Sequence, residues 1–471
     1  MRKTKIICTM GPAIEKEGIL EKLIESGMDC ARFNFSHGDH EEQKPRIENV
    51  KRLRKELNKN VALLLDTKGP ELRLRDFKDG SIILEQGQEF TLLAENTLGD
   101  INQVAINYGE LAATLEIGTK ILIDDGKIAM DVIRIEGKNV VCKIINGGKI
   151  SNRKSVNIPN ASIPMPYICG KDHSDILFGI ENDVDYIAAS FVRNAADVNQ
   201  LRKLLDDNGG EHIKIISKIE NIEGIKNVDE IIDLSDGIMV ARGDLGVEIA
   251  FSELPAIQKT LIEKCYLKGK QVVTATQMLE SMTNSPRPTR AEVSDVANAI
   301  YDGTTVIMLS GETAAGDYPV EAVRTMAEIA LAAEETIDYK AFFNQSQLKL
   351  SNSYADAIAK AACNAAHNLD AKAIVTVTRS GATAELLACY RPNCPIIAVV
   401  VDEKSKMQIN LEFGVVPIQA EEQEFSEQLF HYAVEKAMET GLVSKGDTVV
   451  IVSGSSIASG SQADLMKIHC I

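Results

Sequence analysis

Short apolar runs alternate along this chain with longer stretches in which apolar residues recur at helical spacing. The first runs occupy residues 5–9, 30–33 and 61–65, and helical patterns follow at residues 14–26 and 40–57. A strand followed by a helix, repeated, predicts parallel strands connected by helical crossovers. The chain therefore begins as an α/β fold.

The same alternation returns after residue 157 and continues to residue 336. Strands are predicted at residues 186–190, 213–217, 237–241, 271–275 and 304–309, and helices at residues 171–181, 195–206, 225–234, 251–267, 290–301 and 320–336. With the first three strands, this makes eight strands that are each followed by a helix, the number that a closed (β/α)8 TIM barrel needs. An open doubly wound sheet is the alternative for this pattern.

Residues 73–152 interrupt the alternation. Short alternating runs at residues 81–84, 89–93, 120–123 and 140–145 are separated by Gly, Asp and Asn, and Asp124-Asp125-Gly126 is a typical hairpin turn. The pattern predicts an inserted all-β domain, a small barrel or sandwich. We assign residues 1–68 and 154–340 to the (β/α)8 barrel and residues 69–153 to the inserted β-barrel domain.

A linker at residues 340–351 leads to a third domain, residues 352–471. Helices are predicted at residues 354–369, 383–390 and 425–440, and strands at residues 373–378, 396–401, 448–453 and 466–468. This order predicts a second α/β domain with an open sheet.

Composition narrows the class of protein. The 471 residues are 45% hydrophobic and 25% charged, which gives ample core for several domains, and the net charge is −17. An acidic chain repels polyphosphate backbones, so we expect no nucleic-acid binding. No apolar run is long enough for a signal peptide or a membrane span. Nine cysteines without a Cys-x-x-Cys pair are typical of free thiols in a reducing cytoplasm.

Residues 214–248 carry the pattern on which the functional prediction depends. Two strand-length runs end in charge, the first at Lys218 and Glu220, the second at Arg242 and Asp244. Neighbouring strands lie about 4.8 Å apart, so these side chains can reach the same small space. Two carboxylates and an ammonium there suit a divalent metal and a charged oxygen substrate. A surface ion pair between loops is the alternative.

Polar residues also end the other predicted barrel strands, and in a parallel barrel these ends share one mouth. They are Arg32, Asn34, Ser36, Asp66, Thr67, Arg73, Thr276 and Glu312. Without ligands, acidic and basic side chains at one mouth repel like charges or neutralise one another. A bound metal would offset the acidic side chains and a bound phosphate would offset the basic ones.

Individual roles follow from side-chain chemistry. Glu220 and Asp244 are hard oxygen ligands suited to Mg²⁺. Lys218 is placed to stabilise charge on a transferring phosphoryl group or an adjacent enolate, and Gly243 allows the backbone to approach a ligand closely. A second group has one carboxylate and several neutral side-chain oxygens, which suits a monovalent cation. The alternative is that these side chains form Asx and Ser turns that cap loops. The members of this group are Asn34, Ser36, Asp66 and Thr67.

Two other signals are weaker. His37 and His40 have the spacing of a metal pair, but a loop followed by a helix N-terminus is the favoured interpretation. In the third domain, hydroxyls and backbone amides precede a predicted helix at residues 379–383, which fits either an anion site or an ordinary N-cap.

Eight motifs in this chain resemble those of pyruvate kinases, in order and spacing, over essentially its whole length. They are RFNFSHG (32–38), DTKGPELR (66–73), SKIEN (217–221), IMVARGDLGVE (238–248), TATQMLESM (274–282), PRPTRAE (286–292), DVANAIYDG (295–303) and MLSGETAAGDYP (308–319). The resemblance implies transfer of the phosphoryl group of phosphoenolpyruvate to ADP, giving pyruvate and ATP in the last step of glycolysis. The cofactors it implies are Mg²⁺ (or Mn²⁺) and K⁺.

Roles come from the resemblance by position. Arg32 is similar to the residue that holds the transferred phosphate, Lys218 to the essential lysine, and Thr276 to a residue that acts with bound water in protonating the enolate. The implied substrate contacts are Arg32, Lys218, Ala241, Arg242, Gly243, Asp244 and Thr276. The implied nucleotide contacts are Asn34, His37, Arg73 and Lys154. The implied Mg²⁺ ligands are Glu220 and Asp244, and the implied K⁺ ligands are Asn34, Ser36, Asp66 and Thr67.

The resemblance also implies regulation and assembly. Glu71 matches the K⁺-dependent form of the family, and the insert corresponds to a mobile lid that excludes water when it closes. A cytoplasmic homotetramer is implied, with a sugar-phosphate effector bound near Thr378, Arg379, Ser380, Gly381 and Thr383. Residues 164–172 and 460–464 depart from the usual family pattern, and an acidic residue at position 464 is unfavourable beside phosphates.

Two other classes of function are alternatives to this assignment. A barrel lyase or aldolase of enolate chemistry would use the same Mg²⁺ without needing a nucleotide lid. A non-catalytic sensor of sugar phosphates would keep the fold but would not need Lys218, Glu220 and Asp244.

Overall fold

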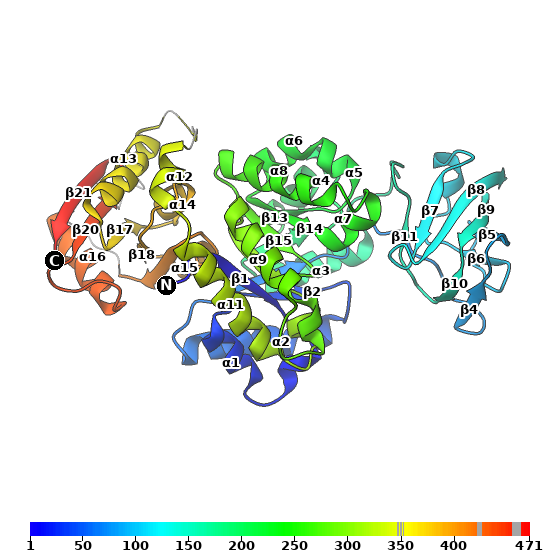
Figure 1. The fold of residues 1–471 in the computed structure, drawn as a ribbon, viewed down its shortest axis with the longest axis horizontal. Helices are drawn as coiled ribbons and strands as arrows, with labels where there is room; N and C mark the ends of the chain where they lie inside the picture. The colour runs from blue at the N-terminus through cyan, green and yellow to red at the C-terminus, as the bar shows by residue number, and fades with distance from the viewer. Residues whose placement is uncertain (346–347, 349–350, 352, 422–425, 455–462) are drawn as a thin grey trace.

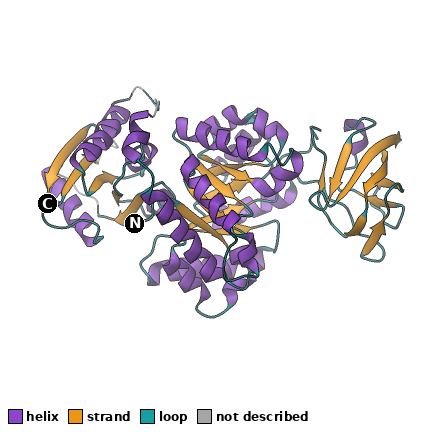
Figure 2. Ribbon diagram, viewed as in Figure 1, coloured by secondary structure: helices purple, strands orange, loops and turns teal. Residues whose placement is uncertain are grey.

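The computed structural model describes residues 1–345, 348, 351, 353–421, 426–454 and 463–471. Figure 1 shows three bodies in a row, with a barrel in the centre, the inserted β-rich segment at one end and the C-terminal α/β segment at the other. In Figure 2 the central strands are enclosed by helices, whereas the inserted segment is almost entirely strand and loop. Across the described residues, none of the helices combines the length and apolarity that crossing a bilayer requires.

Within the described chain, eight parallel strands close into a barrel, which confirms the predicted (β/α)8 fold and excludes the open-sheet alternative. The strands, in chain order, are β1 (Lys5–Thr9), β2 (Cys30–Asn34), β3 (Ala62–Asp66), β12 (Tyr186–Ala189), β13 (Lys214–Ile219), β14 (Gly237–Ala241), β15 (Gln271–Ala275) and β16 (Val306–Leu309). Their inward side chains form one apolar cluster and their outward side chains pack under the surrounding helices. Burial on both sides explains why the strands read as continuous apolar runs.

The helices around the barrel are α1 (Ile19–Ser26), α2 (His40–Glu56), α3 (Gly170–Glu181), α4 (Ala195–Asp206), α6 (Val228–Leu234), α8 (Leu254–Leu267), α9 (Arg290–Asp302) and α11 (Pro319–Glu335). Local signals set their ends: Asn194 caps the first amides of α4, and Thr289 forms a capping box with Glu292 at α9. The helix predicted at residues 14–26 is interrupted, because Gly18 has a φ of 72° between a 3₁₀ turn and α1. The pattern at residues 225–234 belongs to two helices, α5 (Ile222–Lys226) and α6.

The inserted segment is all-β, as predicted. A six-stranded sheet in the order β11-β7-β8-β9-β5-β6 and a two-stranded sheet of β10 and β4 lie within residues 81–157, all of which the structure describes. Asp124, Asp125 and Gly126 have φ values of 53°, 55° and 84°, and they join β7 (Lys120–Ile123) to β8 (Ile128–Glu136), so the predicted hairpin turn is confirmed. The other strands are β4 (Ser81–Leu84), β5 (Glu89–Leu93), β6 (Gln103–Ala105), β9 (Asn139–Asn146), β10 (Gly148–Ser151) and β11 (Val156–Asn157).

The C-terminal segment is an open α/β sheet in the strand order β19-β18-β17-β20-β21 over its described residues. Its elements are α13 (Tyr354–Leu369), β17 (Ala373–Thr378), α14 (Ala382–Cys389), β18 (Ile396–Val400), α15 (Glu403–Ile409), β19 (Val415–Gln419), α16 (Ser426–Glu439), β20 (Thr448–Ser453) and β21 (Leu465–Cys470). Separate apolar clusters lie on the two faces of the sheet, one under α13 and α14 and one under α16. Both faces are therefore covered.

Three predictions for this region need correction or lie partly outside the described residues. The proposed linker includes a helix, α12 (Tyr339–Gln345), and residues 346–347 and 349–350 of the linker are outside the described chain. The start of the helix predicted at residues 425–440 is also outside it, as are residues 460–462 of the atypical C-terminal run. The elements α15 and β19 were not predicted.

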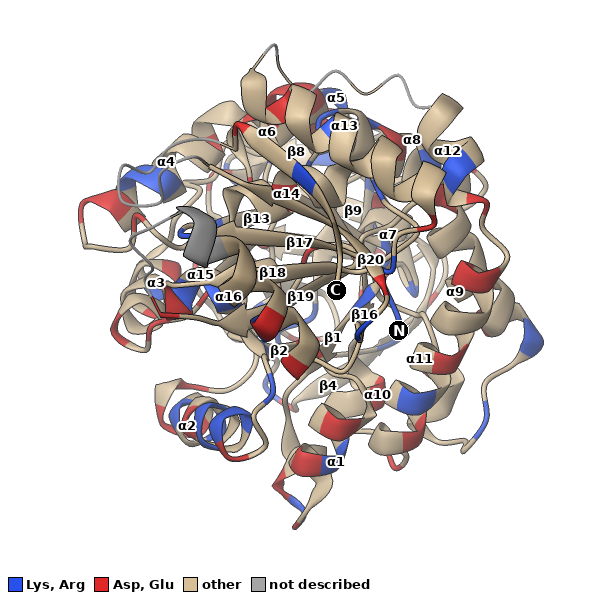
Figure 3. Ribbon diagram, turned by 90° about the vertical axis from the view of Figure 1, so that its left-hand side faces the viewer, with Lys and Arg blue, Asp and Glu red and all other residues tan. Residues whose placement is uncertain are grey.

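Charged residues lie mainly on the outside of the molecule. In Figure 3, positions of Lys and Arg (blue) and of Asp and Glu (red) lie along the ribbons of outer helices such as α1, α2 and α11, while the central strands carry few of either. The nine cysteines form no disulfide in the described part of the chain. The net charge of −17 is thus a solvated surface property, and the charges buried inside the barrel need a separate explanation.

The C-terminal segment closes the N-terminal end of the barrel. Leu411 joins the apolar cluster inside the barrel, the Lys5 ammonium donates to the Val415 carbonyl at 2.8 Å, and the Tyr186 hydroxyl donates to the Gln408 carbonyl at 2.6 Å. The opposite end, where the strands finish and the inserted segment attaches, remains accessible, and this is the end at which barrel enzymes place their chemistry.

Candidate active site

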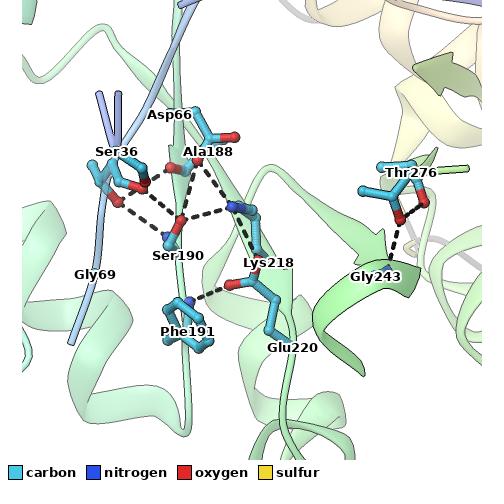
Figure 4. Close-up of polar contacts among 12 residues, drawn as sticks. Ser36, Asp66, Gly69, Ala188, Ser190, Phe191, Lys218, Glu220, Gly243 and Thr276 are labelled. Atoms are coloured by element: carbon cyan, nitrogen blue, oxygen red, sulfur yellow. Dashed lines mark hydrogen bonds and ion pairs between the residues drawn. The ribbon is translucent and has the colours of Figure 1, made fainter. Parts of the chain in front are cut away.

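Lys218 is at the centre of the polar network in the barrel mouth (Figure 4). Its ammonium donates to Asp66 Oδ1 at 3.0 Å and to Ser190 Oγ at 2.7 Å, and it lies 3.0 Å from Glu220 Oε1. Burial alone would lower the pKa of Lys218, but the Asp66 and Glu220 carboxylates outweigh burial and hold the pKa above its ordinary value. Strands β3, β12 and β13 therefore meet through one ammonium group.

Asp66 is shared between two cations. Its Oδ2 accepts a 2.6 Å hydrogen bond from Arg32 Nε, and Arg32 Nη1 donates to Thr9 Oγ1 at 2.9 Å. The carboxylate is fully buried; burial raises its pKa, but Arg32 and Lys218 outweigh that effect and the pKa is lowered overall. Arg32 is thus oriented at the end of β2 by a neighbour on β3.

Glu220 and Asp244 form the predicted carboxylate pair. Glu220 Oε2 accepts from the Phe191 amide at 2.6 Å (Figure 4). Burial raises the pKa of Glu220 to about 8, with Lys218 opposing the shift and the nearby Asp244 carboxylate adding to it. Lys218 therefore offsets only part of the negative charge of this pair. Mg²⁺ commonly takes one or two carboxylates and completes its shell with water and substrate oxygens, so these residues fit a divalent cation.

Among the residues that the structure describes, no group of three or more His, Cys, Asp or Glu side chains is arranged to hold a metal.

The proposed monovalent-cation cluster has oxygen donors only, which suits K⁺. Asn34 Oδ1 accepts from the Ser36 amide at 3.0 Å, and Asn34 is the register partner of Asp66. Thr67 Oγ1 accepts from the Ser190 amide at 3.1 Å. The register pairing places the two loops side by side, and the Asn34–Ser36 bond is also the Asx turn of the alternative interpretation, so both interpretations stay open.

Thr276 lies at the end of β15 with a φ of 70°, an uncommon conformation for a β-branched residue. Its hydroxyl accepts from the Gly243 amide at 2.7 Å and donates to the Ala275 carbonyl at 2.6 Å (Figure 4). Arg242, directly after Ala241, donates to the Thr276 carbonyl at 2.6 Å and to Asp295 Oδ1 at 2.8 Å. Arg242 therefore fixes the backbone beside Gly243 and Thr276, and its guanidinium is already engaged by protein atoms.

An unpredicted helix holds Asp244. Helix α7 (Arg242–Glu248) begins directly after β14, so Gly243 and Asp244 belong to its first turn. Two glycines in RGDLGVE are unfavourable in a helix, which is why the sequence pattern did not reveal it. Glu312 lies outside this network, because its carboxylate accepts from the Leu279 and Ser310 amides.

Two of the predicted nucleotide contacts, Arg73 and Lys154, lie in the inserted segment, and the other two, Asn34 and His37, lie at the end of β2 and just after it. Arg73 Nε donates to Glu71 Oε2 at 2.6 Å, and Lys154 lies 2.8 Å from Asp124 Oδ1. Burial, and then the positive charges of Arg73 and Arg32, lower the pKa of His37. His40 pairs with Asp175 at 2.8 Å instead of joining His37 at a metal, in agreement with the favoured loop-and-helix interpretation.

A hollow of about 200 Å³ lies between the insert and the barrel. Glu71 and Asn157 line it from the insert side, and Arg193 and Asp244 line it from the barrel side. Of the two carboxylates, Asp244 lines this hollow.

The sequence analysis missed three residues of the network, namely Ser190, Phe191 and Thr9, whose hydroxyl accepts from Arg32. Ser190 Oγ donates to the Thr67 carbonyl at 2.6 Å, and Phe191 adopts a φ of 54° while its amide donates to Glu220. Ser190 and Phe191 follow β12 and Thr9 ends β1, and no candidate was drawn from either of these strands. The rule that chemistry gathers at strand ends would have identified them.

In the C-terminal segment, Thr378 Oγ1 accepts from the Gly381 amide at 3.1 Å, and Gly381 has a φ of 85° just before α14. This turn holds Arg379 and Ser380 at the helix start, near Thr383. The anion-site and N-cap interpretations of this loop both stay open.

Comparison with known proteins identifies the family to which this chain is similar. Residues 1–323 match the model of the pyruvate kinase barrel domain, and residues 356–469 match that of the pyruvate kinase α/β domain. The chain is 48% identical over 472 residues to a pyruvate kinase of Geobacillus stearothermophilus, covering 100% of this chain and 80% of that one. It is 47% identical to a pyruvate kinase of Clostridium acetobutylicum, covering 100% of both. A crystal structure of a pyruvate kinase from Cryptosporidium parvum superposes with a TM-score of 0.94 at 41% identity, covering 100% of this chain and 96% of that one.

Proposed function

Because the chain belongs to the pyruvate kinase family, whose reaction is phosphoryl transfer from phosphoenolpyruvate to ADP, we propose that the network around Lys218 carries out that transfer. The protein is a phosphotransferase of glycolysis, and its products are pyruvate and ATP. The family match also rejects the lyase and sensor alternatives drawn from the sequence.

The observation that carries the proposal is the placement of the Lys218 ammonium among Asp66, Ser190 and Glu220. Phosphoryl transfer away from phosphoenolpyruvate leaves negative charge on the enolate oxygen. A fixed cation in a buried, water-poor site stabilises such charge without solvent reorganisation. Lys218 is held by three partners before substrate arrives, so this electrostatic contribution is pre-organised.

Arg32 is the second cation of the mouth. Its Nε and Nη1 atoms are engaged by Asp66 and Thr9, which fixes the plane of the guanidinium at the end of β2. A guanidinium fixed in this way suits the oxygens of a transferring phosphoryl group. We assign Arg32 to that group, and Ala241, Arg242, Gly243 and Asp244 to the wall of the substrate site.

Glu220 and Asp244 would hold Mg²⁺ or Mn²⁺, and the Asn34, Ser36, Asp66 and Thr67 cluster would hold K⁺. When bound, these cations supply the positive charge that offsets the phosphoryl oxygens and the enolate. On the opposite side of the mouth, the Thr276 hydroxyl accepts from the Gly243 amide and donates its proton to the Ala275 carbonyl. We assign this hydroxyl, together with bound water, to protonation of the enolate.

The inserted segment is proposed as a lid, with Arg73, Lys154, His37 and Asn34 contacting the nucleotide. Closure would exclude water, which competes with ADP for the phosphoryl group. The loop from Thr378 to Thr383 is proposed to bind a sugar-phosphate effector in a cytoplasmic homotetramer.

The test is an assay of pyruvate formation from phosphoenolpyruvate and ADP, with Mg²⁺ and K⁺ omitted in turn. Pyruvate should form only with ADP present, Mg²⁺ omission should abolish turnover, and K⁺ omission should depress it strongly. Pyruvate release at the same rate without ADP would contradict the proposed transfer.

A further inference from the structure

The first turn of α3 contacts both loops that carry the proposed K⁺ ligands. The Lys171 ammonium donates to the Phe35 carbonyl at 2.8 Å, between Asn34 and Ser36 in the chain. Asp172 Oδ1 accepts from the Lys68 and Gly69 amides at 3.0 and 3.1 Å, directly after Asp66 and Thr67. Two adjacent residues of one helix therefore hold the two halves of the cation cluster.

The contact between Lys171 and the first loop is supported by further contacts within α3 and with α2. Lys171 also pairs with Asp175 Oδ2 at 2.7 Å, and Asp175 Oδ1 lies 2.8 Å from His40 Nε2. The His40 ring stacks on Phe178 of α3 with ring centroids 4.3 Å apart. The start of α2 and the start of α3 are thus locked together, and the Phe35 carbonyl has a fixed donor.

The second loop, after Thr67, contacts Asp172 on one side and Ser190 on the other. Asp172 is only 2% exposed, so its charge depends on the amide donors that surround it. Gly69 has a φ of 73°, and a Cβ there would come within 2.9 Å of Ser190. The loop after Thr67 is therefore held between Asp172 and Ser190, and Ser190 is also a partner of Lys218.

The same carboxylate reaches the other crossing between barrel and lid. The chain leaves the barrel for the lid after Lys68–Gly69, and the segment that returns from β11 to the barrel ends at Cys169, the N-cap of α3. Cys169 Sγ lies 2.9 Å from Asp172 Oδ2 and accepts from the Asp172 amide at 3.5 Å. The return segment is further held by Arg193, which donates to the Ile163 and Met165 carbonyls at 3.1 and 3.0 Å. Asp172 thus touches both chain crossings of the lid.

We propose that Lys171 and Asp172 are positioning residues that set the spacing of the two K⁺-site loops and link that spacing to the position of the lid. The inference rests on the proposed function, because it takes Asn34, Ser36, Asp66 and Thr67 as K⁺ ligands. A shift of either lid crossing moves the Asp172 carboxylate, and with it the backbone next to Thr67. By linkage, cation binding then favours one lid position, and lid closure tightens cation binding.

The test compares Asp172→Asn and Lys171→Met with the wild type and with Asp207→Asn. Asp207 is an exposed residue paired with Lys203 on α4 and serves as the matched charge-removal control. Three quantities are measured: hydrogen exchange of the Lys68 and Gly69 amides, the K⁺ concentration for half of the K⁺-induced rise in melting temperature, and the K⁺ concentration for half-maximal activity.

For Asp172→Asn we expect exchange at Lys68 and Gly69 to quicken by about tenfold, and both K⁺ midpoints to rise by about tenfold. Lys171→Met should raise the K⁺ midpoints without changing exchange at those two amides, because its contact is with Phe35. At saturating K⁺, the KM for phosphoenolpyruvate should stay within about threefold of wild type. A merely structural role would lower the melting temperature and leave the K⁺ midpoints unchanged.

Wild-type K⁺ midpoints in both variants would overturn the inference, and Lys171→Met alone would decide it if Asp172→Asn failed to fold. Failure of the proposed function looks different. If K⁺ neither stabilised nor activated the wild type more than Na⁺ did, the cation site itself would be wrong, whatever the variants showed.

Discussion

The Lys218 ammonium lies 3.0 Å from Asp66 Oδ1, which joins two residues that are 152 positions apart in the chain. Barrel closure produces this contact, because β3 and β13 flank β12 and end at the same mouth. Asp66 also accepts from Arg32, so one buried carboxylate orients both Lys218, which we assign to the enolate, and Arg32, which we assign to the phosphoryl group. Charge changes at either cation therefore act on a shared partner.

Removing the Lys218 charge tests its electrostatic role. Lys218→Met keeps the apolar stem and should lower kcat by a factor on the order of 10²–10³ or more, the range seen when one stabilising donor is lost. Phosphoenolpyruvate binding should change little, because Arg32 and the cation site are retained. Steady-state kinetics and equilibrium binding separate the two effects. Lys268→Met, which removes an exposed lysine paired with Asp233, is the control, and wild-type turnover in Lys218→Met would refute the assignment.

Glu71 gives a prediction about the monovalent cation. Its carboxylate is bonded to Arg73 at 2.6 Å beside the proposed site. Replacing K⁺ with Na⁺ should lower the rate of the wild type by about tenfold or more, equivalent to about 1.4 kcal/mol. Glu71→Lys, which brings its own positive charge, should reduce that dependence. Equal wild-type rates in the two salts would argue against a cation site linked to Glu71.

Glu412 gives a pH prediction at the junction of the barrel and the C-terminal segment. Burial raises its pKa to about 7, with Lys214, Gln271 and Lys5 opposing the shift and Glu385 adding to it. The folded protein therefore favours the protonated carboxyl. Its stabilising contribution is complete below the unfolded pKa of about 4.5 and is lost as pH rises through about 7.

Glu412→Gln keeps an acceptor for Gln271 but cannot ionise. Its free energy of unfolding should match that of the wild type near pH 5 and exceed it increasingly up to about pH 7, by up to about 1.4 kcal/mol per pH unit, and the difference should then level off. Calorimetry across this range measures the divergence. Parallel curves for the two proteins would show that Glu412 does not titrate in this window.

Gly243 tests how closely the substrate approaches α7. A Cβ at Gly243 would lie 3.6 Å from Thr276 Oγ1, an ordinary contact, so Gly243→Ala should leave the melting temperature nearly unchanged. If substrate packs against this backbone, the KM for phosphoenolpyruvate should rise by about tenfold. Gly246→Ala, on the same helix and 3.7 Å from the Leu254 side chain, is the control. An unchanged KM in Gly243→Ala would remove Gly243 from the substrate site.

The fold and much of the site followed from the sequence because one physical rule covers both. Parallel strands buried on both faces read as apolar runs, and their C-terminal ends must meet at one mouth. That rule placed Lys218, Glu220 and Asp66 together without any contact information.

Features that depend on tertiary packing could not be predicted from the sequence. Leu411, between α15 and β19, joins the apolar cluster inside the barrel, and no local period of the sequence reveals that contact. The engagement of Arg242 by Asp295 depends on the start of α7 facing α9. Phe191 reaches Glu220 only through a left-handed backbone conformation, for which a phenylalanine gives no sequence signal.

The carboxylate pair is the central claim, and a crystal grown with Mn²⁺ and oxalate tests it most directly, since Mn²⁺ scatters anomalously and replaces Mg²⁺. We predict an anomalous peak within ligand distance of both Glu220 and Asp244, about 2.0–2.2 Å from their oxygens. A peak elsewhere in the mouth, with the two carboxylates turned away from it, would contradict the assignment of the site.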